Sequence, residues 1–376
     1  MFDRQLRTAA AALAMGVLAS CASLAPADYE IWALDQGTHV IHIYDSSLKE
    51  TAKIDLGATG VRNPHMVDFT QDHSYAFVAS TGSGDVTVIR AKDRAIVANL
   101  KTGPNTHMAA VRPDDKAVIV DVIGDPKIAR DGKFVEIVVD KAGGNFKLGR
   151  SLVVADDPVF KALGARFNDS NPICHAYAAG GRLAYATLGP GLKDGGLVVL
   201  DTENFRLTHA IPPDELPVNC GTYLMPDRKH MMLNGGSGDV GKWYVVDTTT
   251  NKVVNSGDSG GKDAHGVWGT VDGREIWMVN RVSSNGIVLD AKTLNVVAKL
   301  DEVGPTPDIM AMSPDGKYAF VTTRGPKPIS APHVAKGTTP GFAVIGVADR
   351  KLVRIVQPAA GNESSDFHGI AVRVIR

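Results

Sequence analysis

The chain has 376 residues, 44% of them hydrophobic, and a formal net charge of −1. This hydrophobic content supports a packed core and argues against bulk disorder. A charge so close to zero carries no basic footprint for nucleic acid, so we exclude nucleic-acid binding as a class of function. A chain of this length holds either one large all-β domain or two ordinary domains.

Residues 1–20 are predicted to be an export signal. Arg4 and Arg7 precede an apolar run, Thr8 to Ala19, which is too short to span a bilayer as a helix. We therefore expect this segment to direct secretion rather than to form a transmembrane helix.

The apolar run ends in Leu18-Ala19-Ser20-Cys21, which resembles the bacterial lipobox. That resemblance implies cleavage before Cys21, lipidation of its thiol, and a lipid-anchored domain on the periplasmic face of a bacterial membrane. Ala22 after the cysteine favours the outer membrane. The alternative is an ordinary secretory signal that happens to contain a cysteine.

A short linker at 21–28 is followed by one predicted domain, 29–376. The domain opens with three strands joined by turn signals: Tyr29–Ala33, His39–Tyr44 and Thr51–Leu56. The segment 58–103 then carries four strands with turns between them, and it is the cleanest copy of a unit that recurs along the chain.

A residue able to bind a metal recurs near the start of these units, seven residues before an Asp in a turn. The five pairs are His65 and Asp72, His107 and Asp114, Cys220 and Asp227, His265 and Asp272, and Asp308 and Asp315. A fixed offset indicates one structural position used repeatedly. At His175 the turn comes about two residues early, but an even slip keeps the side chain on the same face of its strand.

The letters YAFVAS, GDVTVI and IVANLKTG within 75–103 resemble the YVTN-type β-propeller family. The resemblance implies blades that are four-stranded meanders, and relatives include the propeller domains of nitrous-oxide reductase and of cytochrome-type nitrite reductases. A lone strand at 366–372 complements the three-stranded opening. The predicted fold is therefore all-β, a seven-bladed β-propeller of four-stranded antiparallel blades, closed by a composite N- and C-terminal blade.

In a propeller the first strand of each blade lines the central channel, so residues near its start gather at one mouth. The predicted ring consists of His65, His107, His175, Cys220, His265, Asp308 and His368. Imidazoles with an optional thiolate and carboxylate suit copper or zinc. Similarity to nitrous-oxide reductase, which holds a copper cluster in a His ring, favours copper, with zinc or haem as alternatives. The histidines could instead bind only water at a polar mouth.

Four polar residues near the ring are predicted to bind a substrate, as an anion close to the metal: Arg62, Asn63, Asn219 and Arg324. Ordinary surface positions are the alternative for the two arginines.

Cys174 and Cys220 each stand at the start of a first strand, in consecutive units. A disulfide between them suits an oxidising compartment and would link adjacent blades. Alternatively, a free Cys220 completes the metal site. The two roles exclude each other.

The pattern as a whole favours an extracytoplasmic, lipid-anchored protein that binds a transition metal, with an oxidoreductase activity on a small molecule and a periplasmic redox partner. A Pro- and Gly-rich excursion at 324–341 motivates a second interpretation. In that interpretation the propeller is a non-catalytic binding or assembly module for a periplasmic redox protein or a tetrapyrrole.

Overall fold

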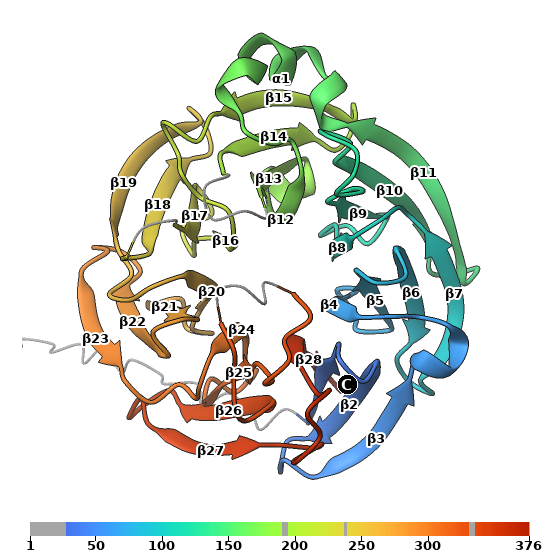
Figure 1. Cartoon of the computed structure of the whole chain (residues 1–376), viewed down its shortest axis with the longest axis vertical. Coiled ribbons are helices and arrows are strands. Elements are labelled where there is room, and N and C mark those ends of the chain that lie inside the picture. Colours follow the sequence, from blue (N-terminus) through green and yellow to red (C-terminus); the bar gives the residue numbers. More distant parts are fainter. Residues whose placement is uncertain (1–27, 190–194, 237–238, 331–334, 376) are drawn as a thin grey trace, which may run out of the picture.

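The computed structural model describes residues 28–189, 195–236, 239–330 and 335–375. In these residues the strands form seven four-stranded antiparallel sheets, arranged as blades around a central axis (Figure 1). The predicted seven-bladed β-propeller is confirmed. Cys21 and the proposed export signal lie outside the described residues.

The blades follow one another in chain order, apart from the first, which the C-terminal strand completes. The composite blade contains β28 (Phe367–Val374), β1 (Tyr29–Asp35), β2 (Val40–Asp45) and β3 (Glu50–Asp55). The next three contain β4 (Pro64–Phe69), β5 (Tyr75–Ser80), β6 (Asp85–Arg90) and β7 (Ala95–Lys101); β8 (Thr106–Val111), β9 (Ala117–Val122), β10 (Lys133–Asp140) and β11 (Asn145–Val153); and β12 (Pro172–Ala178), β13 (Leu183–Leu188), β14 (Leu197–Asp201) and β15 (Arg206–Ile211). The last three contain β16 (Thr222–Leu224), β17 (His230–Gly235), β18 (Lys242–Asp247) and β19 (Lys252–Asp258); β20 (Ala264–Gly269), β21 (Glu275–Asn280), β22 (Asn285–Asp290) and β23 (Val296–Leu300); and β24 (Pro307–Met312), β25 (Tyr318–Thr323), β26 (Gly341–Gly346) and β27 (Leu352–Val356).

In the part of the chain that the structure describes, helical structure is confined to short segments outside the blades. These are α1 (Pro158–Leu163) and the 3-10 turns η1 (Gly57–Thr59), η2 (Val154–Asp156), η3 (Gly164–Arg166) and η4 (Ala179–Gly181). Asp157 caps α1 by accepting a hydrogen bond from the Val159 N–H, and Pro158 suits the first helical turn. Across the described residues, no helix has the length and apolar character needed to cross a membrane.

The middle strands of each blade are buried on both faces because neighbouring blades cover them. In β5 and β6, for example, all but one residue of each strand are buried, whereas β7 on the rim is only partly covered. The core is accordingly a set of inter-blade clusters, such as the one in which Trp32 meets the edge of Phe69 at 5.2 Å between ring centres. This packing fixes the innermost strands rigidly around the channel.

A shared irregularity changes the direction of one side chain on the inner strand of six blades. Pairing with the second strand slips immediately after the first inner-strand residue in six of the blades, at Pro64, Thr106, Pro172, Ala264, Pro307 and Phe367. A residue in such a β-bulge loses its ladder partner, and bulges frequently border functional sites. The bulged residues are the ones that stand at the channel mouth.

Candidate metal centre

Five of the predicted ring residues come together at the channel mouth. They are His65 on β4, His107 on β8, His265 on β20, Asp308 on β24 and His368 on β28, each directly after the first residue of its strand. We call these residues the five-residue cluster. Every member occupies the bulge, so the repeated backbone irregularity explains why side chains from five blades converge.

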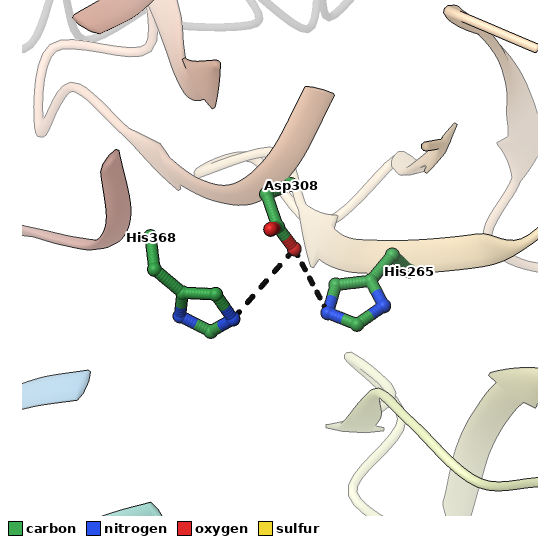
Figure 2. A group of neighbouring side chains, drawn as sticks. All are labelled: His265, Asp308 and His368. Atoms are coloured by element: carbon green, nitrogen blue, oxygen red, sulfur yellow. Dashed lines mark ion pairs between the residues drawn. The ribbon is translucent and has the colours of Figure 1, made fainter. Parts of the chain in front are cut away.

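Asp308 lies between two of the histidines (Figure 2). Its Oδ1 is 2.8 Å from His265 Nε2 and 3.7 Å from His368 Nε2. One ligand atom from each of these residues lies within 4.8 Å of the other two, the spacing expected of groups that share a metal ion. Asp308 Oδ1 is buried and forms no hydrogen bond with any described residue, although His265 is so close.

The outer nitrogens of His65 and His107 are held by groups that only accept hydrogen bonds. His65 Nδ1 lies 2.8 Å from Gln36 Oε1, and His107 Nδ1 lies 2.8 Å from the carbonyl oxygen of Ile173. The Gln36 amide is oriented by its own Nε2, which donates to Asp366 Oδ2 at 2.7 Å. Both imidazoles must therefore carry a proton on Nδ1.

His368 is fixed in the same way, because its Nδ1 donates to the backbone carbonyl of His65 at 3.1 Å. The His65 and His368 rings stack with centres 3.5 Å apart. When neutral, His65, His107 and His368 thus all turn an Nε2 lone pair toward the channel axis. His65 Nε2 and His107 Nε2 lie only 2.9 Å apart. Two lone pairs at that distance repel unless a cation lies between them.

The environment keeps these imidazoles neutral. Burial, followed by the nearby His368 and His107, lowers the pKa of His65 well below its usual range. Burial likewise lowers the pKa of His107 to about 4 and that of His368 far below normal. Burial alone would raise the pKa of Asp308, but His265 and His368, with the nearby arginines, hold it well below its usual range. His65, His107 and His368 therefore offer neutral nitrogens beside the ionised carboxylate of Asp308.

Buried ion pairs surround the carboxylate. Arg324 Nη1 contacts Asp308 Oδ2 at 2.7 Å and its Nε contacts Asp366 Oδ1 at 2.8 Å. Arg281 Nε contacts Asp263 Oδ2 at 2.7 Å, and its Nη1 lies 3.8 Å from Asp308 Oδ1. Two guanidinium groups thus face three carboxylates, which leaves one negative charge to be balanced.

The structure places His175 away from the cluster. The bulge in β12 follows Pro172, so Ile173 takes the position that His65 and His107 take in their blades. His175 lies two residues further on, fully buried, with Nδ1 2.8 Å from Asp121 Oδ2 and with no hydrogen bond from Nε2 to any described residue. The even slip did not bring it to the mouth, because the strand enters the channel at Pro172.

The two cysteines are free buried thiols, so the predicted disulfide is not formed. Each sulfur faces a different histidine: Cys220 Sγ lies 2.8 Å from His265 Nδ1, and Cys174 Sγ lies 3.9 Å from His107 Nδ1. Burial raises the pKa of both thiols far above normal, which keeps them protonated. His265 Nε2 is a free ligand in the tautomer in which His265 Nδ1 donates its proton to Cys220 Sγ.

A cavity of about 530 Å³ opens over the cluster. Asn63 and Asn219 line it as predicted, whereas Arg62 and Arg324 are not among its lining residues. The Arg62 guanidinium donates to the backbone carbonyls of Gly57 and Val61 at 2.9 and 2.8 Å. Arg324 is buried and forms ion pairs with Asp366 and Asp308.

Sequence reasoning missed Gln36 and the Arg281–Asp263 pair. Asp263 and Asp366 each stand two residues before a cluster histidine, as Asn63 and Asn105 do. This repeated spacing of polar residues could have predicted that Asp263 and Asp366 lie beside the cluster. Nothing in the sequence pairs Gln36 with a histidine in the next blade.

Neither a family model nor a curated protein matches the sequence. Among solved structures, a chain of Kuenenia stuttgartiensis hydrazine synthase is similar, with a TM-score of 0.60 and 14% identity over 86% of this chain and 91% of that chain. The dihydro-heme d1 dehydrogenase NirN, solved in complex with DHE, is similar with a TM-score of 0.56 and 14% identity over 91% of this chain and 74% of that one. At this identity the similarity shows the propeller fold alone.

Proposed function

We propose that the chain binds a transition-metal ion, copper in the first place, through His65, His107, His265, Asp308 and His368. The observation that carries the proposal is the set of three imidazoles fixed with Nδ1 protonated and Nε2 aimed at one volume. Metal-binding histidines characteristically donate their other N–H to a carbonyl or carboxylate, which fixes the ring and its tautomer.

A proton shared between His65 and His107 is the competing explanation for their 2.9 Å contact. The lowered pKa of both groups argues against it at neutral pH, because each imidazole resists a charge of its own. A metal ion satisfies several lone pairs at once and also accepts Asp308 Oδ1, the buried acceptor that forms no hydrogen bond in the described chain.

The donor set favours copper over the other first-row divalent ions. Imidazole nitrogens suit copper, zinc, iron and nickel, and copper binds most tightly of these to a given nitrogen and oxygen site. A bound copper ion would supply one-electron redox chemistry at a position open to the cavity. The protein's own residues position it: Gln36 and the Ile173 carbonyl hold two ligands, and Cys220 holds a third.

An oxidoreductase acting on a small molecule, with electrons passed to a periplasmic partner, is the activity that we propose for such a centre. The lipid anchor at Cys21 and the periplasmic location, preferentially at the outer membrane, belong to this proposal and rest on the N-terminal sequence alone.

A second candidate is a binding or assembly module for a tetrapyrrole or a periplasmic redox protein. It is supported by the similarity to NirN, whose structure contains DHE, and by a cavity in the size range of small-molecule sites. Haem would then replace copper as the cofactor.

Metal analysis of the purified protein tests the first candidate. We expect stoichiometric copper after loading and dialysis, with zinc displaced, and a loss of affinity of at least about tenfold in His107→Ala and His265→Ala. His209→Ala, at an exposed histidine on β15, is the control and should bind as the native chain does. A protein that retains no copper, or cluster variants that behave like the control, would refute the proposal. A protein that binds haem and retains no copper would favour the second candidate.

A further inference from the structure

The cavity over the cluster has an apolar rim built by two loops. Ile128 is 57% exposed on the loop between β9 and β10, and Ile329 is 45% exposed on the loop between β25 and β26. Both line the cavity, as do Ile123, Ile173 and Ile309. Large exposed apolar side chains that border a concave site commonly contact a ligand.

The two loops stand across the mouth from each other. Their blades are separated by two blades in one direction around the ring and by three in the other. A molecule seated over the cluster would therefore meet an isoleucine on each side, so that its body is held between two apolar walls.

The carboxylates that line the cavity outnumber the cations. Among the described lining residues the cations are Arg130 and Arg281, and the carboxylates are Asp125, Asp169 and Asp263. Arg281 contacts Asp263 at 2.7 Å, and Arg130 Nη2 donates to the backbone carbonyls of Gly164 and Phe167 at 2.9 and 2.7 Å. An anionic group on a ligand would thus lose its hydration close to an excess of negative charge, which is costly.

We infer that the substrate is an uncharged or cationic organic molecule with an apolar, ring-sized body, and that it is not an organic anion. The inference deepens the proposed function by naming the substrate class of the same site. Probe binding and metal binding are measured independently, so the two proposals can fail separately.

A matched pair of fluorescent probes tests this in the metal-free protein. N-phenyl-1-naphthylamine is neutral, and 8-anilino-1-naphthalenesulfonate has the same rings with an added sulfonate. We expect the neutral probe to bind and the sulfonate to bind at least about tenfold more weakly. Equal affinities, or tighter binding of the sulfonate, would overturn the inference whatever the copper measurements show.

Variants at the rim locate the binding. Ile128→Asp should lower the affinity for the neutral probe at least several-fold. Ile128→Lys should raise the affinity for the sulfonate probe, so that the two probes bind with more similar affinities. The controls are Val353→Asp and Val353→Lys, at a 55% exposed valine on the outer strand β27 that does not line the cavity. If the Ile128 and Val353 variants have the same effect, or if none has any, the probes bind elsewhere and the inference is wrong.

Discussion

At the scale of single residues, the tautomers of the cluster are decided by groups that can only accept. A backbone carbonyl or an amide oxygen forces the proton of a neutral imidazole onto the nitrogen that faces it. The Ile173 carbonyl, the His65 carbonyl and Gln36 Oε1 do this for three histidines. The Nε2 atoms of these three histidines are thus left without a proton when the imidazoles are neutral, which suits the proposed metal binding.

Gln36 should therefore matter for metal binding without being a ligand. Gln36→Leu removes the acceptor of His65 Nδ1, so the ring is free to turn and to exchange tautomers. We expect metal affinity to fall by about 10–100-fold, the usual effect of losing such a supporting group, with a changed metal absorption spectrum. Isothermal titration of the metal into the variant measures this.

Gln357→Leu, at an exposed position, is the control for Gln36→Leu. Both variants should show the circular dichroism of the native chain. Native affinity and spectrum in Gln36→Leu would mean that the contact with His65 has no part in preparing the site.

At the scale of the strand, the positions of the cluster residues were predictable where a constant number of residues separates the bulge from the turn Asp. The offset from the turn Asp selected five residues, of which His65, His107, His265 and Asp308 joined the cluster and Cys220 did not. It failed in β12, because the structural register counts from the bulge after Pro172. The preceding insertion and an early turn shift that strand, and sequence spacing alone does not reveal where a strand enters the channel.

A second feature at the scale of the strand is the buried ion pair next to the composite blade. β28 pairs with β1 along its length, and Arg324 joins the entry of β28, through Asp366, to Asp308 on β24. The guanidinium is almost wholly buried. Arg324 thus ties the segment leading into β28 to the preceding blade and balances charge on Asp308, whereas the sequence suggested it only as a substrate contact.

Arg324→Met should destabilise the protein strongly. It leaves two buried carboxylates without their shared cation, and breaking a buried ion pair from one side costs about 3–5 kcal/mol. Urea unfolding followed by tryptophan fluorescence measures the loss. Arg62→Met is the matched control, because that exposed guanidinium contacts only backbone carbonyls, and it should change stability little. A loss no larger than in the control would show that the buried ion pairs of Arg324 contribute little to stability.

At the scale of the whole molecule, the fold was predictable because it is a repeat. Every unit carries the same order of strands and turns, and the three-stranded opening with the lone final strand required a composite blade. Side-chain contacts between neighbouring blades were not predictable, because they obey no period. Gln36 with His65 and Arg324 with Asp366 each join two adjacent blades.

At the scale of the whole molecule, buried groups in the channel region also make the stability of the protein depend on pH, in opposite directions. The pKa of His107 is lowered from 6.5 to about 4 by burial, so between these pH values the unfolded chain binds a proton that the folded chain does not. Stability is then lost as the pH falls from 6.5 toward 4. Burial raises the pKa of Asp68 from 3.8 to about 6, so this group has the opposite effect, and its contribution declines as the pH rises from 4 to 6.

His65 and His368 have lowered pKa values as well, so the histidines outnumber Asp68 and the metal-free protein should lose stability on acidification below pH 6.5. His107→Gln should make that loss shallower by removing one titrating group, whereas Asp68→Asn should make it steeper by removing the opposing one. Urea midpoints at pH 4.5, 5.5, 6.5 and 7.5 measure all three slopes. Parallel curves for the native chain and both variants would mean that neither group titrates differently on folding. A steeper loss in His107→Gln would mean that its imidazole is already charged in the folded state, as a proton shared with His65 requires.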